Sequence, residues 1–272
     1  MQILFFKSLP RKNGSETSLS MILGLETSGR SGSAALGFPC GDVICSFTPS
    51  GEGSAKMLAP AVSELLRFSK IRPSDLRAVA VTIGPGSFTG LRVGVAMAKA
   101  MAYGLRIPTI GIDTLEVLAD DFLDSLQQSE QTGNFEFWTV LDAYRGEFFV
   151  AKWLSSPTAS TDHPEGLRSI HDGPICLVPS QILPQKIWYE LATTASSEIV
   201  VVGSGVTKLL GIAKTEFSSV VSFSNIVPTA TSVTRLAARM FRDGQVTPPI
   251  DLMPVYMRGS AAEEKKSAGK ST

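Results

Sequence analysis

The chain has 272 residues, of which 43% are hydrophobic and 18% charged, and its 25 basic side chains balance 25 acidic ones. This composition is typical of a globular protein that forms one large domain or two lobes. A net charge of zero excludes a whole-protein electrostatic attraction to nucleic acid, so RNA contact would need a local patch or a partner. No apolar run approaches the roughly 18 residues that a membrane span requires, so we expect a cytoplasmic protein.

Neither end of the chain has a sequence typical of a folded core. Residues 1–20 contain one short apolar run, whose charges follow it instead of preceding it, which argues against a signal peptide. Residues 259–272 hold no side chain able to anchor in a core. We therefore expect a disordered extension at 1–20 and a disordered tail at 259–272.

Residues 21–125 are predicted to form a first α/β lobe. Apolar β-branched runs and glycine turns indicate strands, and apolar residues at helical spacing indicate helices. The order is strand, strand, strand, helix, strand, helix, strand, helix, over 21–27, 33–37, 43–47, 54–69, 78–83, 88–104, 109–112 and 114–122.

A glycine-rich elbow joins the fourth of these strands to its helix. Gly84 and Gly86 free the turn from steric limits, and Pro85 fixes φ within it. Ser87 is placed to cap the helix by accepting a backbone N–H, and Thr89 lies in its first turn. Such an elbow suits either an anion or a closely packed neighbour.

The helix over 88–104 carries two glycines one turn apart, Gly90 and Gly94, beside its apolar stripe. Each glycine costs about 1 kcal/mol in a helix, so we expect another helix to approach closely there. That neighbour is either the 54–69 helix or a second subunit, and the sequence favours neither. The residues predicted to bind a partner are Met57, Ala61, Phe68, Gly90, Gly94, Met97 and Met101.

Three basic residues, Arg92, Lys99 and Arg106, are spaced by seven and so share one face of the same helix. A solvated face is the commoner meaning of this pattern. Contact with RNA or an acidic partner is the alternative.

Residues 126–258 are predicted to form a second lobe that repeats the first. LETSGRSGSAAL and LDAYRGEFFVAKW both give a strand, an acidic residue, a glycine turn and a second strand. Further elements are expected at 137–141, 147–153, 199–202 and 232–243. Two related α/β lobes around a cleft are the architecture of sugar kinases, actin and Hsp70-like ATPases.

Proteins of that architecture place an acidic residue after the first strand of each lobe, beside glycine turns that hold phosphates. The corresponding residues are Glu26, Asp142, Gly203 and Gly205. One interpretation is a vestigial nucleotide site. The other, which we favour, is that these acids cap the turns that follow their strands.

Other catalytic chemistries have little support. The two histidines, His163 and His171, do not have the spacing of a metal-ligand pair, so no metal is expected. The sequence around Ser87 lacks the G-x-S-x-G pattern of a serine nucleophile. Three cysteines without a C-x-x-C motif are read as free buried thiols: Cys40, Cys45 and Cys176.

The run GPGSFTGLRVGVAMAKAMAYGLRIPTIGIDTLEVLA resembles the signature stretch of TsaB proteins, also called YeaZ. LETS, LDAYRGEFFV, VGSGV and PVYMR match the family in the same order, so the resemblance spans about residues 21–258. It implies a two-lobed Hsp70/actin-like fold. It also implies a non-catalytic subunit that pairs, through the helices matching 54–69 and 88–104, with the related catalytic subunit TsaD.

The resemblance places this protein in the synthesis of threonylcarbamoyladenosine, the modified base next to the anticodon of ANN-reading tRNAs. It implies partnership with TsaD and the ATPase TsaE, tRNA contact through the complex, and homodimers through the same helices. No cofactor is expected on this chain, and ATP and metal are expected on its partners. A small-molecule kinase of the same fold is the alternative, and a metallo- or serine peptidase is a third hypothesis.

Three features depart from the family pattern. Glu26 stands where the family usually has aspartate, which argues against nucleotide binding by this chain alone. The 54–69 helix lacks the histidine that many relatives carry near its start, and residues 1–20 have no family counterpart.

Overall fold

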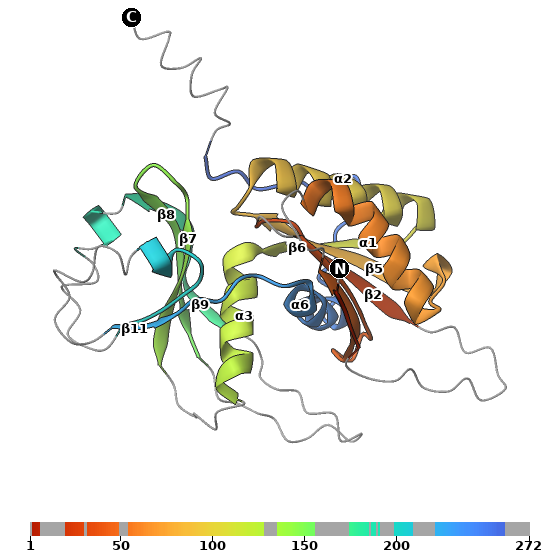
Figure 1. Cartoon of the computed structure of the whole chain (residues 1–272), viewed down its shortest axis with the longest axis horizontal. Coiled ribbons are helices and arrows are strands. Elements are labelled where there is room, and N and C mark those ends of the chain that lie inside the picture. Colours follow the sequence, from red (N-terminus) through yellow and green to blue (C-terminus); the bar gives the residue numbers. More distant parts are fainter. Residues whose placement is uncertain are drawn as a thin grey trace, which may run out of the picture.

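The structure is a computed structural model that describes residues 2–5, 20–29, 32–48, 54–127, 135–155, 174–184, 186–188, 190, 199–208 and 221–258. Two β-sheets stand apart, and two helices, α3 and α6, lie between them (Figure 1). The longer helices are α1 (Ser54–Ser69), α2 (Phe88–Leu105), α3 (Thr114–Gln127) and α6 (Ala230–Arg242).

The first sheet has the strand order β1-β4-β3-β2-β5-β6 among the described residues. Its strands are β1 (Gln2–Phe5), β2 (Met21–Glu26), β3 (Ser33–Gly37), β4 (Val43–Thr48), β5 (Leu76–Gly84) and β6 (Thr109–Asp113). β2, β5 and β6 run parallel, and β1, β4, β3 and β2 form antiparallel pairs. The strands predicted within 21–112 are thus confirmed to within a few residues.

One strand lies where we expected disorder. Gln2–Phe5, within the supposed extension, pairs antiparallel with β4 at the edge of the sheet. An edge strand presents unpaired N–H and C=O groups that a short extended segment can satisfy. The expectation of disorder is wrong for these four residues, and the rest of 1–19 lies outside the described residues.

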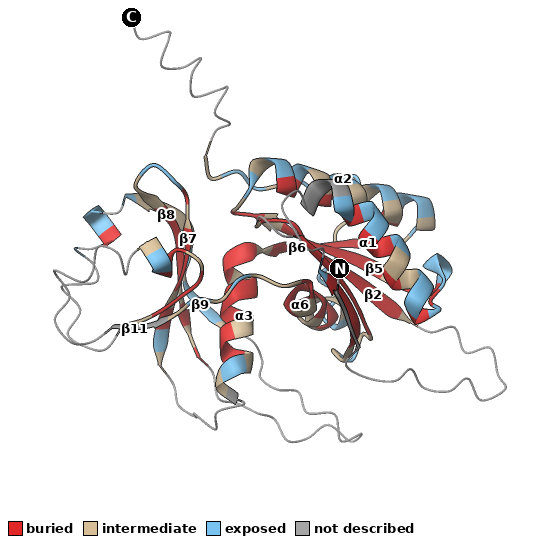
Figure 2. Cartoon of the chain, in the orientation of Figure 1, coloured by how far each residue is buried: buried red, intermediate tan, exposed pale blue. Residues whose placement is uncertain are grey.

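Helices cover both faces of the first sheet, and buried residues concentrate there (Figure 2). Alternate residues of β2 point to opposite sides, as expected for a strand. Leu23 packs with α1 and α2, whereas Ile22 packs with α6. Gly24 faces α6 and allows close approach, because a Cβ there would lie 3.0 Å from the carbonyl oxygen of Ala230.

The second sheet has the order β11-β10-β7-β8-β9 among the described residues. Its strands are β7 (Glu136–Asp142), β8 (Glu147–Leu154), β9 (Ile175–Pro184), β10 (Ile199–Val202) and β11 (Val221–Ser224). Helix α3 packs its apolar residues, including Leu118 and Phe122, against this sheet around Phe137. Strands β9 and β11 were not predicted from the sequence.

The end of the described chain returns to the first lobe, which corrects the predicted boundary. We expected 126–258 to form the second lobe, but α6 packs on β2 and β3 of the first sheet. Beyond α6, Thr247 pairs with Thr109 of β6, and Leu252 is buried in the first lobe's core. We call residues 247–258 the C-terminal strap.

Candidate functional site

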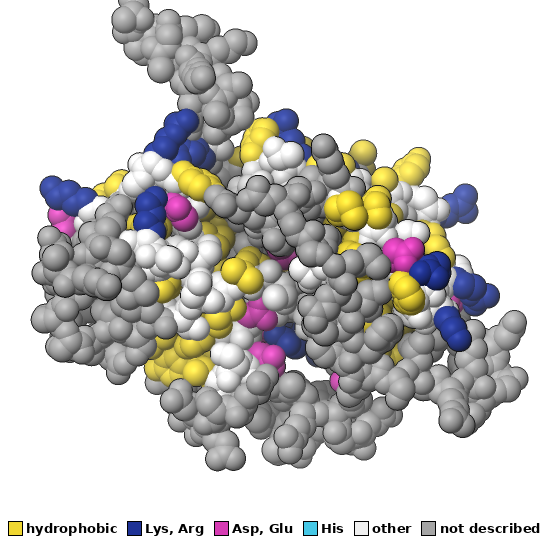
Figure 3. Space-filling view, viewed as in Figure 1, with side chains coloured by type: hydrophobic (Ala, Val, Ile, Leu, Met, Phe, Trp, Pro, Cys, Tyr) yellow, Lys and Arg dark blue, Asp and Glu magenta, His cyan; other side chains and the backbone are white. Residues whose placement is uncertain are grey.

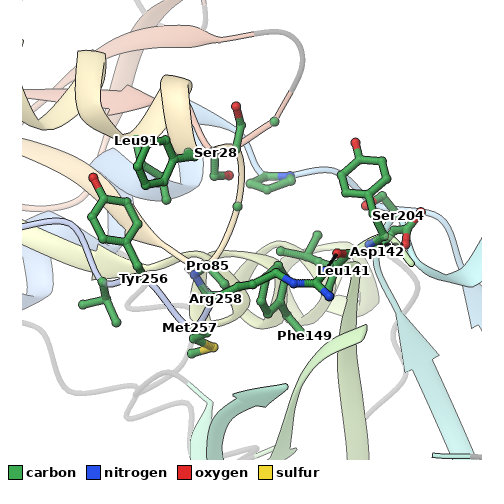
Figure 4. Close-up of a pocket in the computed structure, with 18 of the residues that line it drawn as sticks. Ser28, Pro85, Leu91, Leu141, Asp142, Phe149, Ser204, Tyr256, Met257 and Arg258 are labelled. Carbon is green, nitrogen blue, oxygen red and sulfur yellow. Dashed lines mark hydrogen bonds between the residues drawn. The ribbon is translucent and has the colours of Figure 1, made fainter. Parts of the chain in front are cut away.

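A cleft of about 900 Å³ lies between the lobes. The first lobe contributes the end of β2, the elbow after β5 and the start of α2, and the second contributes the turn between β7 and β8. The C-terminal strap closes one side with Tyr256, Met257 and Arg258; Tyr256 lies beside Leu91 of the first lobe, and Arg258 extends toward Leu141 of the second (Figure 4). Much of the lining is apolar, including Leu91, Leu141 and Phe149.

The glycine-rich elbow is filled by the chain itself. The Ser87 amide donates to the carbonyl oxygen of Ser28 at 2.7 Å, and a Cβ on Gly86 would lie 2.7 Å from that same oxygen. A Cβ on Gly84 would collide with the carbonyl oxygen of Val255 in the strap. Of the two uses predicted for this elbow, the structure shows the closely packed neighbour.

Ser87 caps α2 as predicted. Its side-chain oxygen accepts from the Gly90 amide at 3.2 Å, and its carbonyl accepts from the Leu91 amide at 2.8 Å. Thr89 lies exposed in the first turn of the helix. The serine side chain is therefore engaged in capping, which does not suit a catalytic nucleophile.

Glu26 at the end of β2 is 1% exposed and is held by the turn that follows it. Its carboxylate accepts from the amide of Ser28 at 2.6 Å and from the Ser28 hydroxyl. Burial raises the pKa of Glu26 to about 7, and the hydrogen bonds from Ser28 oppose that rise. A carboxyl group held in this way caps its own turn, as we favoured from the sequence.

Asp142 at the end of β7 is committed in a similar way. Its Oδ1 accepts from the Tyr144 amide at 2.8 Å and pairs with Lys208 Nζ at 2.9 Å. The glycine turn that follows β10 packs on β7, because a Cβ on Gly205 would lie 2.7 Å from the Val140 side chain. Gly203 likewise meets the Val140 carbonyl oxygen. Both acids and both glycine turns thus serve packing within the chain.

The ATPases of this architecture bind a magnesium nucleotide with a carboxylate near the metal and with backbone amides open to phosphates. In the described residues, the Glu26 carboxylate and Asp142 Oδ1 are already engaged within the chain. Within the described residues, no three His, Cys, Asp or Glu side chains come together as a metal site. His163 and His171 lie outside those residues.

The cysteines differ in part from expectation. All three are free, and Cys45 is buried as predicted. Cys40 and Cys176 are exposed, because Cys40 lies in the turn before β4 and Cys176 on the exposed edge strand β9.

In the described part of the chain, no helix is both long and apolar enough to span a membrane.

The residues predicted to bind a partner separate into two groups. Met57 and Phe68 on α1 are 44% and 43% exposed, and Met97 and Met101 on α2 are half-buried beside the core. Ala61 is buried, and it packs inside the first lobe's core. The first four therefore remain at or near the surface, whereas Ala61 is excluded from it.

Gly90 and Gly94 are also excluded from a partner surface. Both are buried, and the residue that approaches them is Thr27 of the same chain, at the end of β2. The expectation of a second helix or subunit at these glycines is wrong. The two glycines indicated a close approach to the helix, but only the fold shows that the approaching group is the end of strand β2.

The basic stripe of α2 also has an internal role. Lys99 Nζ donates to the carbonyl oxygens of Ile250 and Leu252, each at 3.0 Å. Arg92 Nε donates to the Tyr256 hydroxyl at 3.0 Å. Two of the three predicted basic residues thus hold the C-terminal strap against α2, which the sequence analysis missed because the pairs are far apart in sequence.

A buried ionic cluster between α3 and α6 was also missed. Asp120 is fully buried between Arg235 and Arg239, at 2.8 Å and 2.6 Å. Burial raises the pKa of neighbouring Asp121 to about 7, although Arg235 opposes that rise. The cluster lies between the two sheets and joins the helices that connect the lobes.

The strap ends on the second lobe. Arg258 pairs with Glu147 of β8 at 2.5 Å and donates to the Ala143 carbonyl oxygen at 2.7 Å.

Two α/β lobes joined by crossing helices, with a cleft between them, define the Hsp70/actin-like class. A crystal structure from Pseudomonas aeruginosa, of a protein with similarity to peptidase YEAZ, shares this fold with a TM-score of 0.67 and 22% identity. The match covers 88% of this chain and all of that one.

Sequence comparisons add the family. The family model of TsaD, tRNA N6-adenosine threonylcarbamoyltransferase, matches residues 50–153. A transferase of that name from Desulfitobacterium hafniense is 49% identical over 59 residues, or 22% of this chain and 17% of that one. The tRNA threonylcarbamoyladenosine biosynthesis protein TsaB of Escherichia coli K12 is 26% identical over 90% of this chain and 97% of its own length. Over most of its length, the chain is similar to TsaB (YeaZ) proteins.

Proposed function

We propose that this protein acts in tRNA threonylcarbamoyladenosine biosynthesis as a non-catalytic subunit. It pairs with a TsaD-type transferase, works with a TsaE-type ATPase and contacts tRNA through the complex, in the cytoplasm. The main support for the proposal is that the two acidic residues at the ends of β2 and β7, Glu26 and Asp142, form hydrogen bonds within the chain. Ser28 donates to the Glu26 carboxylate, and Tyr144 and Lys208 donate to Asp142 Oδ1, which supports structural roles for both acids.

The surface of α1 and α2 is the proposed docking site for the transferase. Hydrophobic side chains gather along the edge of the molecule that carries these helices (Figure 3). Met57 and Phe68 of α1 and Tyr103 of α2, which is 79% exposed, belong to it. Exposed apolar side chains gathered on one face favour a protein partner.

The resemblance to the transferase suggests how the two chains meet. Its family model covers residues 50–153, which include α1 and α2, so the partner carries a similar pair of helices. Similar surfaces pair readily about a two-fold or near two-fold axis. The same reasoning allows a homodimer, in which a second copy competes for the surface that the transferase uses.

The docking surface is tested with the double variant Met57→Ser/Phe68→Ser. Both side chains are half exposed, so the variant should fold and yet bind a purified TsaD-type partner at least tenfold more weakly than the wild type. The matched control is Ile175→Ser, at a 49% exposed residue on β9. Equal binding by the wild type and the double variant in isothermal titration calorimetry would contradict the proposed surface.

The alternative of a small-molecule kinase has a separate test. It requires magnesium-dependent ATP turnover by the purified chain, lost on Asp142→Ala. Our account expects no turnover above a no-protein blank with either the wild type or the variant. Substrate-dependent turnover that disappears with Asp142 would establish the kinase.

A further inference from the structure

The C-terminal strap lies along α2, on the side away from α1. Helix α1 covers β3 and β4, α2 covers β2, β5 and β6, and the strap pairs with β6 at the sheet edge through Thr247. Lys99 holds the strap at Ile250 and Leu252, and Arg92 holds it at Tyr256. The order across this side of the molecule is therefore α1, α2, strap, and α2 is the central element.

Two apolar side chains of the strap point to solvent. Ile250 is 76% exposed and Met253 is 64% exposed, whereas Leu252 between them is 3% exposed and anchors the segment in the core. The fold therefore needs Leu252 but gains little from the other two. Isolated exposed apolar residues are ordinary, but these two lie on one short segment, and Lys99 of α2 contacts both residues.

The backbone of the strap is held in a fixed position. Prolines at 248, 249 and 254 restrict it, and the Lys99 ammonium group binds two of its carbonyl oxygens. A backbone that is already ordered loses little conformational entropy on binding, which favours affinity. A rigid, exposed, apolar segment is thus suited to protein contact.

We infer that the strap is the third element of the docking surface, and that the transferase-type partner covers Ile250 and Met253 when it binds over α2. The inference rests on the proposed function and extends it to residues outside the two helices.

The size of protein interfaces supports this occupant. A stable interface buries about 800 Å² on each partner, which corresponds to a roughly circular patch about 16 Å in radius. The strap is joined to α2 by direct hydrogen bonds, so it lies well inside a patch of that radius centred on the helix. A partner that pairs its own matching helices with α1 and α2 would therefore also cover the strap beside α2.

The chemistry of the surface points the same way. Lys99 directs its ammonium group to the strap carbonyl oxygens and to the Met253 sulfur, which is 3.9 Å away. The Lys99 ammonium group is therefore occupied by hydrogen bonds to the strap. The most exposed apolar side chains of the strap are Ile250 and Met253, which suit an apolar protein face better than a polyanion.

The test compares the affinity of four purified chains for the TsaD-type partner. They are the wild type, Ile250→Ser/Met253→Ser, Met57→Ser/Phe68→Ser and the control Ile175→Ser. Thermal unfolding of each chain checks that the fold is intact, as expected because the altered residues are exposed. We expect the strap variant to raise Kd at least tenfold and Ile175→Ser to change it less than twofold.

The outcomes separate this inference from the proposed function. If the wild type and the strap variant bind equally while the helix variant binds weakly, the strap inference is overturned and the proposed function stands. If the wild type does not bind, the proposed function fails and the inference fails with it. If the strap variant loses only self-association, measured by sedimentation of the chain alone, the occupant is a second copy and the inference is overturned.

Discussion

The carbonyl oxygen of Thr27 stands where Gly90 would have to place a side chain. Gly90 is buried in the first turn of α2, so the end of β2 and the helix meet backbone to backbone. We predict that Gly90→Ala lowers the free energy of unfolding by at least about 1–3 kcal/mol, because the backbone must shift to admit a methyl group. Urea unfolding measures the change.

The control for this prediction is Gly104→Ala on the same helix. Gly104 is exposed and a Cβ there would meet nothing within 4 Å, so alanine should stabilise the chain by roughly 0.5–1 kcal/mol through helix propensity. Opposite signs for the two variants support the close contact at Thr27. Equal and small effects would show that the strand end and helix are not packed this tightly.

Periodicity was enough to predict most of the first lobe, because its elements have strong local signals. The apolar run of β5, the elbow and the Ser87 cap all follow from neighbouring residues. The identity of the group opposite Gly90 could not be predicted from spacing, because Thr27 is more than sixty residues away in sequence and is brought in by strand pairing.

Ser87→Ala tests the structural role of the serine in the elbow. Loss of an N-cap oxygen costs about 1 kcal/mol, and we expect that decrease in the free energy of unfolding. Thr89→Ala, at an exposed residue in the same turn, should change stability by less than about 0.5 kcal/mol. We expect neither variant to alter tRNA modification in a reconstituted complex. A specific loss of modification with a stable Ser87→Ala chain would point to a chemical role.

The ionic cluster between α3 and α6 should contribute strongly to stability. Asp120 is fully buried between two arginines, so Asp120→Ala removes the carboxylate that pairs with Arg239, while Arg235 keeps Asp121 and Asp124, and the change should cost about 3 kcal/mol. Glu64→Ala, which breaks an exposed pair with Arg67, should cost far less, because solvent screens that pair. Similar costs in thermal unfolding would contradict the structural importance of the cluster.

The buried carboxyl of Glu26 predicts a pH dependence of stability. Its pKa is about 7 in the folded chain against an ordinary 4.5, so the folded state binds the proton more tightly than the unfolded state. Its contribution to stability is full below pH 4.5 and is lost as the pH rises to about 7. Asp121, whose pKa is also raised to about 7, adds to the same trend.

The variant Glu26→Gln separates the contribution of Glu26 to this pH dependence from that of Asp121. The amide oxygen can still accept from Ser28, and no charge is buried at high pH, so the variant should equal the wild type near pH 4.5. At pH 8 it should be more stable, by up to about 3 kcal/mol. Denaturant titrations at both pH values make the comparison. A variant less stable than the wild type at pH 8 would show that the ionised carboxylate is favoured in the folded chain.

The candidate site was only partly accessible to sequence reasoning. Glu26 and Asp142 were found because each follows a strand, and their role as turn caps follows from the same local pattern. The strap contacts were not found, since Lys99–Ile250 and Arg258–Glu147 join segments separated by more than a hundred residues. The boundary between lobes was placed wrongly for the same reason, because α6 crosses back to the first sheet.

The central claim is that this chain assists a catalyst and does not perform the reaction itself. The most direct test measures threonylcarbamoyladenosine formed on an ANN-reading tRNA by purified TsaD-type and TsaE-type proteins, with and without this chain. Our account predicts modification only when the chain is added, none with the chain alone, and an unchanged yield with Asp142→Ala. Modification by the chain alone, or an equal yield whether or not it is present, would contradict it.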